Sequence, residues 1–426
     1  MKRLSKSLFL FFTLLVLTLI PAQSTMAASA RPGNVSKLTA KASSDTSVKL
    51  TWSKASKAMG YRVYVVDTAT NKLKKVATTT KNTCEIKKIN IDQTYVFQVY
   101  AYRKSGSKTY LSAKGSPMAT VRTKLSTPGK PSKFRFICSG NNSVFLAWNE
   151  AKNADKYIIY QYDETTGEYK QVLTTSETSC QIKKLVAGQK YYFKIQSYHA
   201  LQGKEAYGAI SDKISATPKT VNVSAIHGRY WNATVKKNVS VKTSTGSTLT
   251  LKKGTSIIAT KNSTSTLTAK LKNGTTFTIK GSNLKYGNLY VTKSYYSKDQ
   301  KEAFVNGRGY SSPTGYLVWI NQYTCNTSIF KGSKGAWKLV RSMPCVIGAY
   351  GRSTQGVLKL CKRTSAHNKP KIYYTWNKKK QYGNSFHCRI DKNTRAAVSG
   401  GCIRLGDSDL YYLANHCPLG TTVVSY

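Results

Sequence analysis

Acidic residues are scarce in this sequence. Of its 426 residues, 17 are Asp or Glu and 67 are Lys or Arg, which gives a formal net charge of +50 at pH 7. A surplus of this size attracts polyanions. The basic residues are dispersed through segments with strand character, and no basic arm, zinc finger or recognition-helix pattern accompanies them. We therefore expect no nucleic acid among the partners.

Long apolar runs are also lacking, apart from one near the start. That run extends from Leu8 to Ile20, follows Lys2, Arg3 and Lys6, and ends at Pro21. It is shorter than the ~20 residues that span a bilayer. The small residues after it include Ala28-Ser29-Ala30, which fits the A-x-A cleavage pattern of a secretory signal. We predict a signal peptide over residues 1–30 and no transmembrane segment after its removal; an uncleaved anchor is the alternative.

The sequence has no C-x-x-C motif, and its nine cysteines form no compact disulfide framework. The odd count leaves at least one thiol free within a single chain. His387-Cys388, Cys402 and His416-Cys417 are evenly spaced, which invites a zinc hypothesis. Neighbouring residues on a strand face opposite ways, so each pair could offer only one ligand. Structural zinc sites normally use short ligand loops, and we predict neither a metal nor an organic cofactor.

An internal repeat gives the clearest architectural signal. Many residues recur at a constant offset of 96, including the pairs Trp52 and Trp148, Tyr61 and Tyr157, Cys84 and Cys180, and Tyr95 and Tyr191. Each copy alternates apolar and polar residues between turn-forming clusters, which predicts short antiparallel strands. Two β-sandwiches follow, over residues 31–125 and 126–220. They resemble fibronectin type III domains, with the tryptophans in the cores and Tyr95 and Tyr191 as tyrosine corners.

Residues 221–294 have a different composition. They contain twelve Lys or Arg residues and no Asp or Glu. Short β runs such as 256–260 and 276–279 alternate with turns at Lys253-Gly254 and Asn273-Gly274. The wording "LKKGT…KLKNGTTFTIKGSNL" resembles a bacterial SH3-like wall-binding barrel; the alternative is a basic β spacer. For an exported protein with this net charge, the anionic polymers of a Gram-positive cell wall are the expected partner.

The residues that point to chemistry lie near the C-terminus, in Ser399-Gly400-Gly401-Cys402-Ile403-Arg404. Glycines before a cysteine allow a tight turn and leave amide N–H groups near whatever the sulfur attacks. A thiolate at neutral pH needs a base or a positive charge beside it. His387 lies fifteen residues upstream, and a hairpin-like return would bring its imidazole to the sulfur. Arg404 alternates to the same side as Cys402 and could hold a carboxylate.

His387 followed by "SGGCIRL" resembles the YkuD-type L,D-transpeptidase family. The run "GYLVWI" at residues 315–320 resembles the family's opening strand, and "IFKGSKGAWKLVRSMPCVIG" at residues 329–348 resembles its next hairpin. The closing helix and strand also agree with the resemblance, which covers residues 315–426. The family often has His where this chain has Gly400, and Thr354-Gln355-Gly356 only partly matches the family's Thr-Pro-x-Gly. The fold class that follows is a mainly β, multidomain protein with a C-terminal, mostly β catalytic domain.

The resemblance implies a mechanism. Cys402, with His387 as its base, attacks the carbonyl of the third residue of a peptidoglycan tetrapeptide stem and expels the terminal D-alanine. Amides near Gly401 and Cys402 stabilise the oxyanion, with Ser399, Gly400 and Arg404 as further oxyanion or substrate-binding residues. An amine of a neighbouring stem resolves the thioester. Members of the family are typically sensitive to carbapenems, and the expected location is the wall of a Gram-positive bacterium.

Other functions remain open from the sequence. An L,D-carboxypeptidase would use water in place of the amine. A catalytically inactive wall-associated binding or adhesive protein would need only the sandwiches, and replacing Cys402 would then change nothing. A papain-like wall peptidase places its cysteine well before its histidine, whereas only 24 residues follow Cys402. That order argues against the papain-like alternative.

Overall fold

The computed structural model describes residues 31–261, 265–292, 294–377, 379, 383–388 and 395–426. The expected signal peptide, residues 1–30, lies outside this part of the chain. One compact unit ends at Ser126 and takes in Ala200–Ala206, and the other holds Thr127–His199 with Tyr207–Tyr426. In the described ranges no helix is both long enough and apolar enough to cross a membrane.

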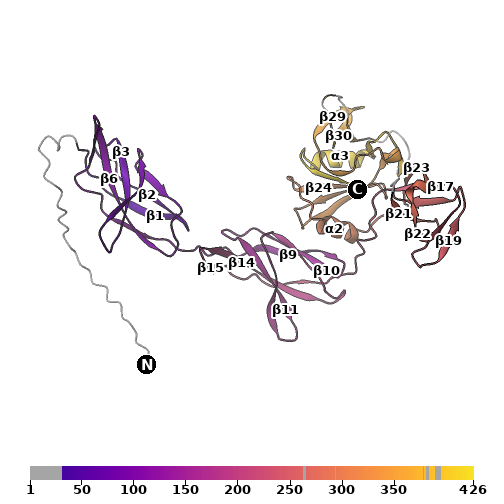
Figure 1. The fold of residues 1–426 in the computed structure, drawn as a ribbon, viewed down its shortest axis with the longest axis horizontal. Coiled ribbons are helices and arrows are strands. Elements are labelled where there is room, and N and C mark those ends of the chain that lie inside the picture. The colour runs from indigo at the N-terminus through magenta and orange to yellow at the C-terminus, as the bar shows by residue number, and fades with distance from the viewer. Residues whose placement is uncertain (1–30, 262–264, 293, 378, 380–382, 389–394) are drawn as a thin grey trace. The chain divides into compact units, whose positions relative to one another are not determined.

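The first unit is a β-sandwich of two antiparallel sheets (Figure 1). One sheet has the strand order β1-β2-β5 and the other β4-β3-β6-β7, with β8 paired to β6. The strands are β1 (Thr39–Ser44), β2 (Ser47–Thr51), β3 (Gly60–Val66), β4 (Leu73–Thr79), β5 (Thr83–Ile86), β6 (Thr94–Ser105), β7 (Lys108–Leu111) and β8 (Ala119–Arg122).

The second sandwich repeats this topology, with sheets β13-β10-β9 and β12-β11-β14-β15 and with β16 paired to β14. Its strands are β9 (Ser132–Gly140), β10 (Ser143–Asn149), β11 (Lys156–Asp163), β12 (Glu168–Thr175), β13 (Ser179–Ile182), β14 (Tyr191–Leu201), β15 (Lys204–Tyr207) and β16 (Ile214–Ala216).

The repeated aromatic residues occupy matching places in both sandwiches. Trp52 and Trp148 are buried, and each meets a tyrosine ring edge-on at a centroid distance of 5.3 Å. The Tyr95 hydroxyl accepts the N–H of Asn90 at 2.9 Å, and the Tyr191 hydroxyl accepts the N–H of Val186 at 3.0 Å. These are the hydrogen bonds of tyrosine corners. The prediction of two fibronectin-like sandwiches is confirmed.

The second sandwich differs from the first in its central strand β10, which is buried on both faces. Phe145 and Ala147 stand where the first repeat has the exposed residues Lys49 and Thr51. Together with Ile137, Cys138 and Ala336 they form one buried apolar cluster. The outer face of this sheet is thus covered by the C-terminal part of the chain.

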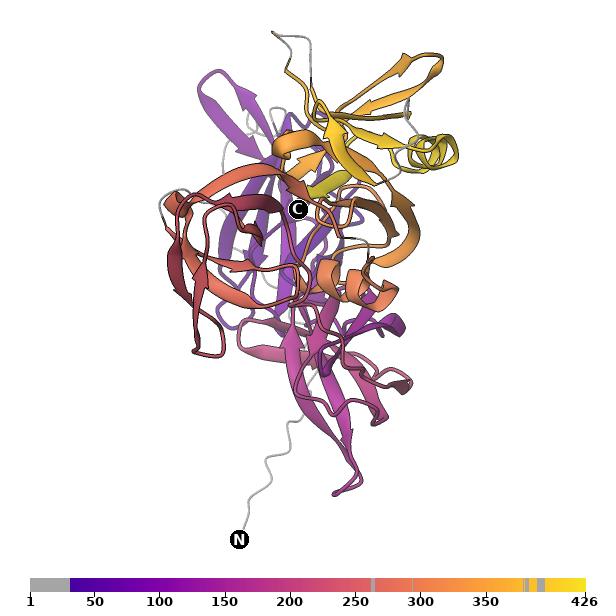
Figure 2. The same ribbon diagram turned by 90° about the vertical axis from the view of Figure 1, so that its right-hand side faces the viewer.

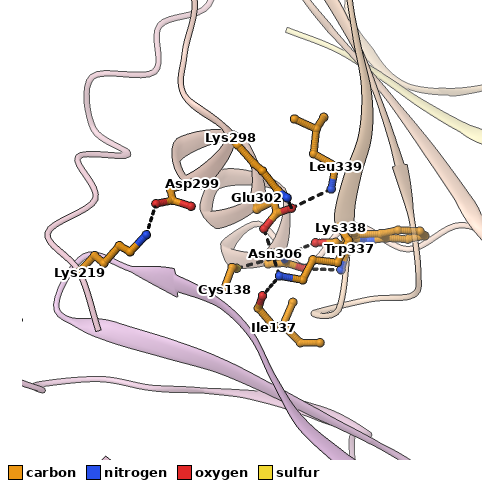
Figure 3. Close-up of polar contacts among 10 residues, drawn as sticks. All are labelled: Ile137, Cys138, Lys219, Lys298, Asp299, Glu302, Asn306, Trp337, Lys338 and Leu339. Carbon is orange, nitrogen blue, oxygen red and sulfur yellow. Dashed lines mark hydrogen bonds and ion pairs between the residues drawn. The ribbon is translucent and has the colours of Figure 1, made fainter. Parts of the chain in front are cut away.

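Polar contacts complete the same interface (Figure 3). The Glu302 carboxylate, almost fully buried, accepts the Leu339 N–H at 2.9 Å and pairs with the Lys338 ammonium at 3.4 Å. Lys338 also donates to the carbonyl oxygen of Ile137 in β9. At the edge of the interface, Lys219 pairs with Asp299 at 2.9 Å. A paired and hydrogen-bonded buried carboxylate holds its neighbours in one arrangement, since breaking the pair would leave a charge unpaired.

The basic segment forms an antiparallel β module around its own core. A five-stranded sheet has the order β22-β21-β20-β17-β23, and β18-β19 is a hairpin. The elements are β17 (Tyr230–Val235), β18 (Val239–Lys242), β19 (Thr248–Leu251), β20 (Ser256–Ala259), β21 (Thr266–Lys270), β22 (Thr276–Lys280), η1 (Gly281–Asn283) and β23 (Leu284–Tyr290). Its resemblance to an SH3-like barrel stays a prediction.

This module is not a detached spacer. Leu289 of β23 belongs to the buried core of the following segment, and Trp231 of β17 packs against that core. Figures 1 and 2 show the module beside the sheets of the C-terminal segment. The two parts therefore share apolar burial, the dominant favourable term in folding.

In its described residues, the last segment comprises two sheets and two α-helices, with strand orders β26-β25-β24-β34-β28 and β29-β30-β31-β33-β27-β32. The elements are α2 (Lys298–Gly307), β24 (Tyr316–Asn321), β25 (Asn326–Lys331), β26 (Lys338–Pro344), β27 (Val346–Gly348), η2 (Ala349–Gly351), β28 (Gly356–Lys359), β29 (Lys362–Ala366), β30 (Lys369–Tyr373), β31 (Ser385–Cys388), β32 (Ala396–Ser399), β33 (Ile403–Leu405), α3 (Asp407–His416) and β34 (Thr422–Ser425). Both sheets and α3 contribute to one core.

Candidate active site

Two neighbouring parallel strands carry the candidate residues. In the pairing of β31 with β33, His387 lies opposite Arg404, and Phe386 lies opposite Ile403. Phe386 and Ile403 are fully buried, whereas His387 and Arg404 are half-buried. Because side chains alternate along a strand, His387 and Arg404 share the outer face. Cys402, two positions before Arg404, belongs to that face too.

The prediction of a hairpin-like return between His387 and Cys402 is wrong. The two strands run in the same direction, and β32 lies between them in the sequence. A parallel pair needs a crossover rather than a tight turn. The crossover still brings the imidazole to the sulfur, because the parallel register sets Ser385 and His387 against Cys402 and Arg404.

The Cys402 thiol has two polar neighbours on this face. Ser385 Oγ lies 3.5 Å from Cys402 Sγ, and His387 also forms a side-chain hydrogen bond with the thiol. Burial alone raises the pKa of Cys402, but the hydrogen bonds from His387 and Ser385 favour the thiolate and lower its pKa to about 7. A large share of Cys402 is therefore in the nucleophilic form at neutral pH.

A backbone carbonyl orients the imidazole. His387 Nδ1 lies 3.0 Å from the carbonyl oxygen of Cys388. A carbonyl oxygen can only accept, so Nδ1 carries the proton of this bond and Nε2 is the nitrogen that can take a proton from the thiol. The strand that supplies the base thus also selects its tautomer.

The turn before Cys402 is tied together by Ser399. The buried Ser399 hydroxyl donates to the carbonyl oxygen of Cys402 at 2.6 Å and accepts the N–H of Gly401 at 3.1 Å. The Gly401 amide, expected to help form an oxyanion hole, is therefore already engaged by Ser399. This leaves the Cys402 amide as the candidate oxyanion donor of the pair.

The two glycines of the turn have different surroundings. Gly401 has φ +133°, and a Cβ there would lie 2.6 Å from Asn384 Nδ2 and 3.0 Å from the Arg352 carbonyl oxygen. Only glycine fits that position without strain. A Cβ on Gly400 would meet no heavy atom within 4 Å, so a larger side chain has room at that position.

Three further side chains hold this turn, and the sequence did not reveal them. Ser353 Oγ donates to the Gly401 carbonyl oxygen at 2.7 Å and accepts the Gly348 N–H at 2.8 Å. The Tyr374 hydroxyl lies 3.4 Å from the same carbonyl oxygen, and burial raises the pKa of Tyr374 so that it stays neutral. Asn384 Oδ1 accepts the backbone N–H of Thr354 at 3.0 Å. Ser353 adjoins the Thr354-Gln355-Gly356 run, which was the one local signal for this support.

The basic module also supports the site. Arg229 Nε donates to Gln322 Oε1 at 2.8 Å, and its Nη2 donates to the carbonyl oxygen of Ser353. Asn288 Nδ2 donates to the carbonyl oxygen of Ala397 at 2.7 Å, while Asn288 Oδ1 accepts the N–H of Tyr350 at 2.7 Å. These bonds link residues between 62 and 124 positions apart in the chain, and local sequence patterns carry no sign of them.

Other cysteines lie in environments that suppress reactivity. Burial raises the pKa of Cys138, Cys180, Cys345 and Cys417 to about 12, and it also raises the pKa of Cys325. Cys84 and Cys180 pack against the cores of their sandwiches, as their repeated position predicted.

In the described ranges no group of three or more His, Cys, Asp or Glu side chains is arranged to hold a metal ion.

Comparison with protein families places this geometry in context. Residues 220–424 match the L,D-transpeptidase catalytic domain (YkuD), and residues 33–114 and 129–212 match the fibronectin type III domain. The chain therefore contains two fibronectin type III domains followed by an L,D-transpeptidase catalytic domain. The match to the catalytic domain begins well before residue 315 and includes the basic module.

Two solved structures illustrate the similarity. A fused Zn-dependent amidase/peptidase/peptidoglycan-binding domain-containing protein from Clostridium acetobutylicum is 24% identical, with a TM-score of 0.26, over 30% of this chain and 59% of that chain. A segment of two fibronectin type III domains from chicken tenascin is 20% identical, with a TM-score of 0.24, over 44% of this chain and 99% of the segment. This chain thus spans just over half of the Clostridium protein.

Proposed function

We propose that this protein is an exported L,D-transpeptidase that cross-links peptidoglycan through an acyl-enzyme on Cys402. The observation that carries the proposal is the shared face of β31 and β33, where Cys402 has a pKa lowered to about 7 beside His387. The match of residues 220–424 to the catalytic domain supports the reaction class.

In the first step, the Cys402 thiolate attacks the carbonyl carbon of the third residue of a tetrapeptide stem. The bond from that carbonyl to the nitrogen of the terminal D-alanine breaks, and the imidazolium of His387 gives its proton to the departing amine. General acid and base catalysis by a positioned histidine typically contributes 10²–10⁴-fold to such a step. The amide of Cys402 is placed to donate to the developing oxyanion.

In the second step, an amine of a neighbouring stem attacks the thioester. His387 Nε2 accepts the amine proton, the carbon–sulfur bond breaks, and the thiolate of Cys402 is regenerated. Arg404, on the same face as His387, would hold a stem carboxylate through the planar fork of its guanidinium. No metal or organic cofactor enters either step.

The setting we propose is the outside of a Gram-positive cell. The sequence of residues 1–30 supports export, and the net charge of +50 supports attraction to anionic wall polymers. Long-range attraction of this kind raises the local concentration of protein at a charged surface and weakens with added salt.

Incubation with a disaccharide-tetrapeptide, with and without an acceptor stem, tests this function. A dimer joined through two third-position residues, formed together with free D-alanine, is the expected product. Release of D-alanine with only the tripeptide formed, even at high acceptor concentration, would assign an L,D-carboxypeptidase. No D-alanine from folded protein would leave the inactive wall-associated protein as the account of this chain.

A further inference from the structure

The basic module carries a pocket of about 430 Å³ that the proposed reaction does not use. Strands β17, β20 and β23 form it, together with Lys272 just after β21. The lining residues that the argument needs are Asn232, Thr234, Lys272, Lys285, Tyr286 and Tyr290. We propose that this pocket binds a linear polyanion in which phosphodiesters alternate with sugar or polyol units.

The register of the strands shows how the pocket is built. Thr234 pairs with both Ser256 and Lys285 across its two neighbouring strands, and Asn232 pairs with Ile258. Directly paired residues of antiparallel strands lie on the same face of a sheet. Asn232, Thr234 and Ser256 therefore share the face opposite the module's core with the apolar Ile258. Lys285 lies beside Thr234 on that face.

The two lysines of the pocket are not neutralised by the protein. In the part of the chain that the structure describes, neither Lys272 nor Lys285 forms an ion pair or a side-chain hydrogen bond. Residues 221–294 contain no Asp or Glu that could screen them. Elsewhere in the same unit, Lys170 and Lys334 pair with carboxylates at 2.6 and 2.8 Å. The pocket thus presents two uncompensated ammonium groups, which are point charges suited to phosphate.

Aromatic surface lies beside this charge. Tyr290 lines the pocket and is half-buried. Tyr286 is also part of the lining, but it pairs with Ala233 and packs against the module's core, so Tyr290 is the ring on the face of Asn232. A tyrosine ring offers a flat apolar surface with a polar tip. Such rings can pack against the C–H groups of a sugar or polyol while the lysines contact the phosphates on either side. This combination favours a phosphodiester polymer over a simple inorganic anion.

The pocket is connected to the catalytic turn through one residue. Asn288 follows Gly287, and its side chain binds the carbonyl oxygen of Ala397 and the N–H of Tyr350. Ala397 lies in β32, which ends at Ser399. The side chain of Asn288, next to the pocket residue Gly287, thus joins the strand that forms one wall of the pocket to the strand that ends at the Ser399–Cys402 turn. The inference rests on the proposed function, because it names the wall polymer that would retain the enzyme near its substrate.

Binding of a defined poly(glycerol phosphate) oligomer to the full chain, measured by calorimetry at physiological salt, tests the inference. The variant Lys272→Gln/Lys285→Gln is compared with Lys252→Gln/Lys253→Gln, which removes the same charge from an exposed turn of the same module. The pocket variant loses two lysines and should bind on the order of thirtyfold more weakly, which corresponds to about 2 kcal/mol. The turn variant should change the affinity less than about threefold, because neither lysine lines the pocket and an exposed surface charge contributes little by itself.

An equal loss of affinity for the oligomer in both variants would contradict a specific site in the pocket and would favour attraction by the net charge as a whole. So would tighter binding of single-stranded DNA than of the oligomer by the wild-type protein. Acylation of Cys402 by the tetrapeptide is measured on the same samples. If Lys272→Gln/Lys285→Gln loses binding of the oligomer but is still acylated at Cys402, the result supports the pocket as a separate site. Unchanged binding with acylation intact overturns only the pocket, whereas absent acylation in the wild type contradicts the proposed function.

Discussion

Ser385 Oγ lies 3.5 Å from Cys402 Sγ, although the two residues are 17 positions apart in the chain. The parallel pairing of β31 with β33 produces this contact, and it places His387 beside the same sulfur. Two hydrogen-bonding groups from β31 therefore stabilise a thiolate at the residue that immediately precedes β33.

Replacing Ser385 by Ala should raise the pKa of Cys402 above its value of about 7. The hydroxyl favours the charged form, so its loss shifts the rise of reactivity with pH toward higher pH. The pH dependence of thiol alkylation, followed by mass spectrometry, measures this. Ser365→Ala, at an exposed position of β29, is the control and should leave the profile unchanged. Superimposable profiles for Ser385→Ala and the wild type would show that the hydroxyl has no such role.

The two glycines before Cys402 should respond oppositely to substitution. Gly400→His should fold and retain acylation, because a Cβ at residue 400 meets no atom within 4 Å. Gly401→Ala should lose acylation by at least about a hundredfold, since the added Cβ would lie 2.6 Å from Asn384 Nδ2 and distort the turn. Acylation rates together with circular dichroism distinguish the two. An active Gly401→Ala variant would contradict the described turn.

Much of the architecture was predictable because its signals are local or repeated. The offset of 96 placed Trp52 with Trp148 and Tyr95 with Tyr191, and the structure gives each pair the same role. The pairing of Cys402 with His387 came from a family resemblance, and the structure brings the two side chains together. The direction of the strands could not be inferred, because spacing alone does not distinguish a hairpin from a crossover.

The packing of the second sandwich against the C-terminal part of the chain could have been predicted by comparing the two repeats. Phe145 replaces Lys49 at an outward position, which is costly unless something covers it. Phe145→Ala should destabilise this interface by about 3–5 kcal/mol, and Lys49→Ala in the first sandwich should change stability by less than ~0.5 kcal/mol. Hydrogen exchange of the amides in α2 reports the loss locally, which avoids assuming two-state unfolding. Unchanged exchange in Phe145→Ala would contradict the interface.

The support of the catalytic turn could not be predicted in the same way. Arg229 and Ser353 are 124 positions apart, and Asn288 and Ala397 are 109 apart. Each is an ordinary polar residue in its local sequence, and its role arises only when the module and the catalytic sheets share a core. Such contacts are set by tertiary packing, which no local pattern encodes.

Lys301 should make the free energy of unfolding depend on pH in the alkaline range. It is buried, donates to Asn326 Oδ1 at 2.7 Å and to Ser342 Oγ at 2.6 Å, and burial lowers its pKa from 10.5 to about 8. Between those two values the unfolded chain binds more protons than the folded one, so stability rises with pH by an amount on the order of 3 kcal/mol. Below pH 8 the full cost of the buried charge is present.

Urea unfolding from pH 7 to pH 10.5, compared between the wild type and Lys301→Met, isolates this term. The variant should be the more stable of the two at pH 7, and the difference should shrink as pH rises. Lys359→Met, at an exposed position of β28, should track the wild type throughout. A Lys301→Met variant that is less stable by the same amount at every pH would show that the lysine's hydrogen bonds, and not its charge, dominate.

The most direct test of the central claim is to locate the covalent intermediate. Mature protein is mixed with a disaccharide-tetrapeptide, quenched, and analysed by intact mass and peptide mapping beside Cys402→Ala and His387→Ala. The account predicts an adduct of the donor less D-alanine, on Cys402 alone, absent from Cys402→Ala and strongly slowed in His387→Ala. An adduct on Cys388 or Cys417, or none on folded wild-type protein, would contradict it.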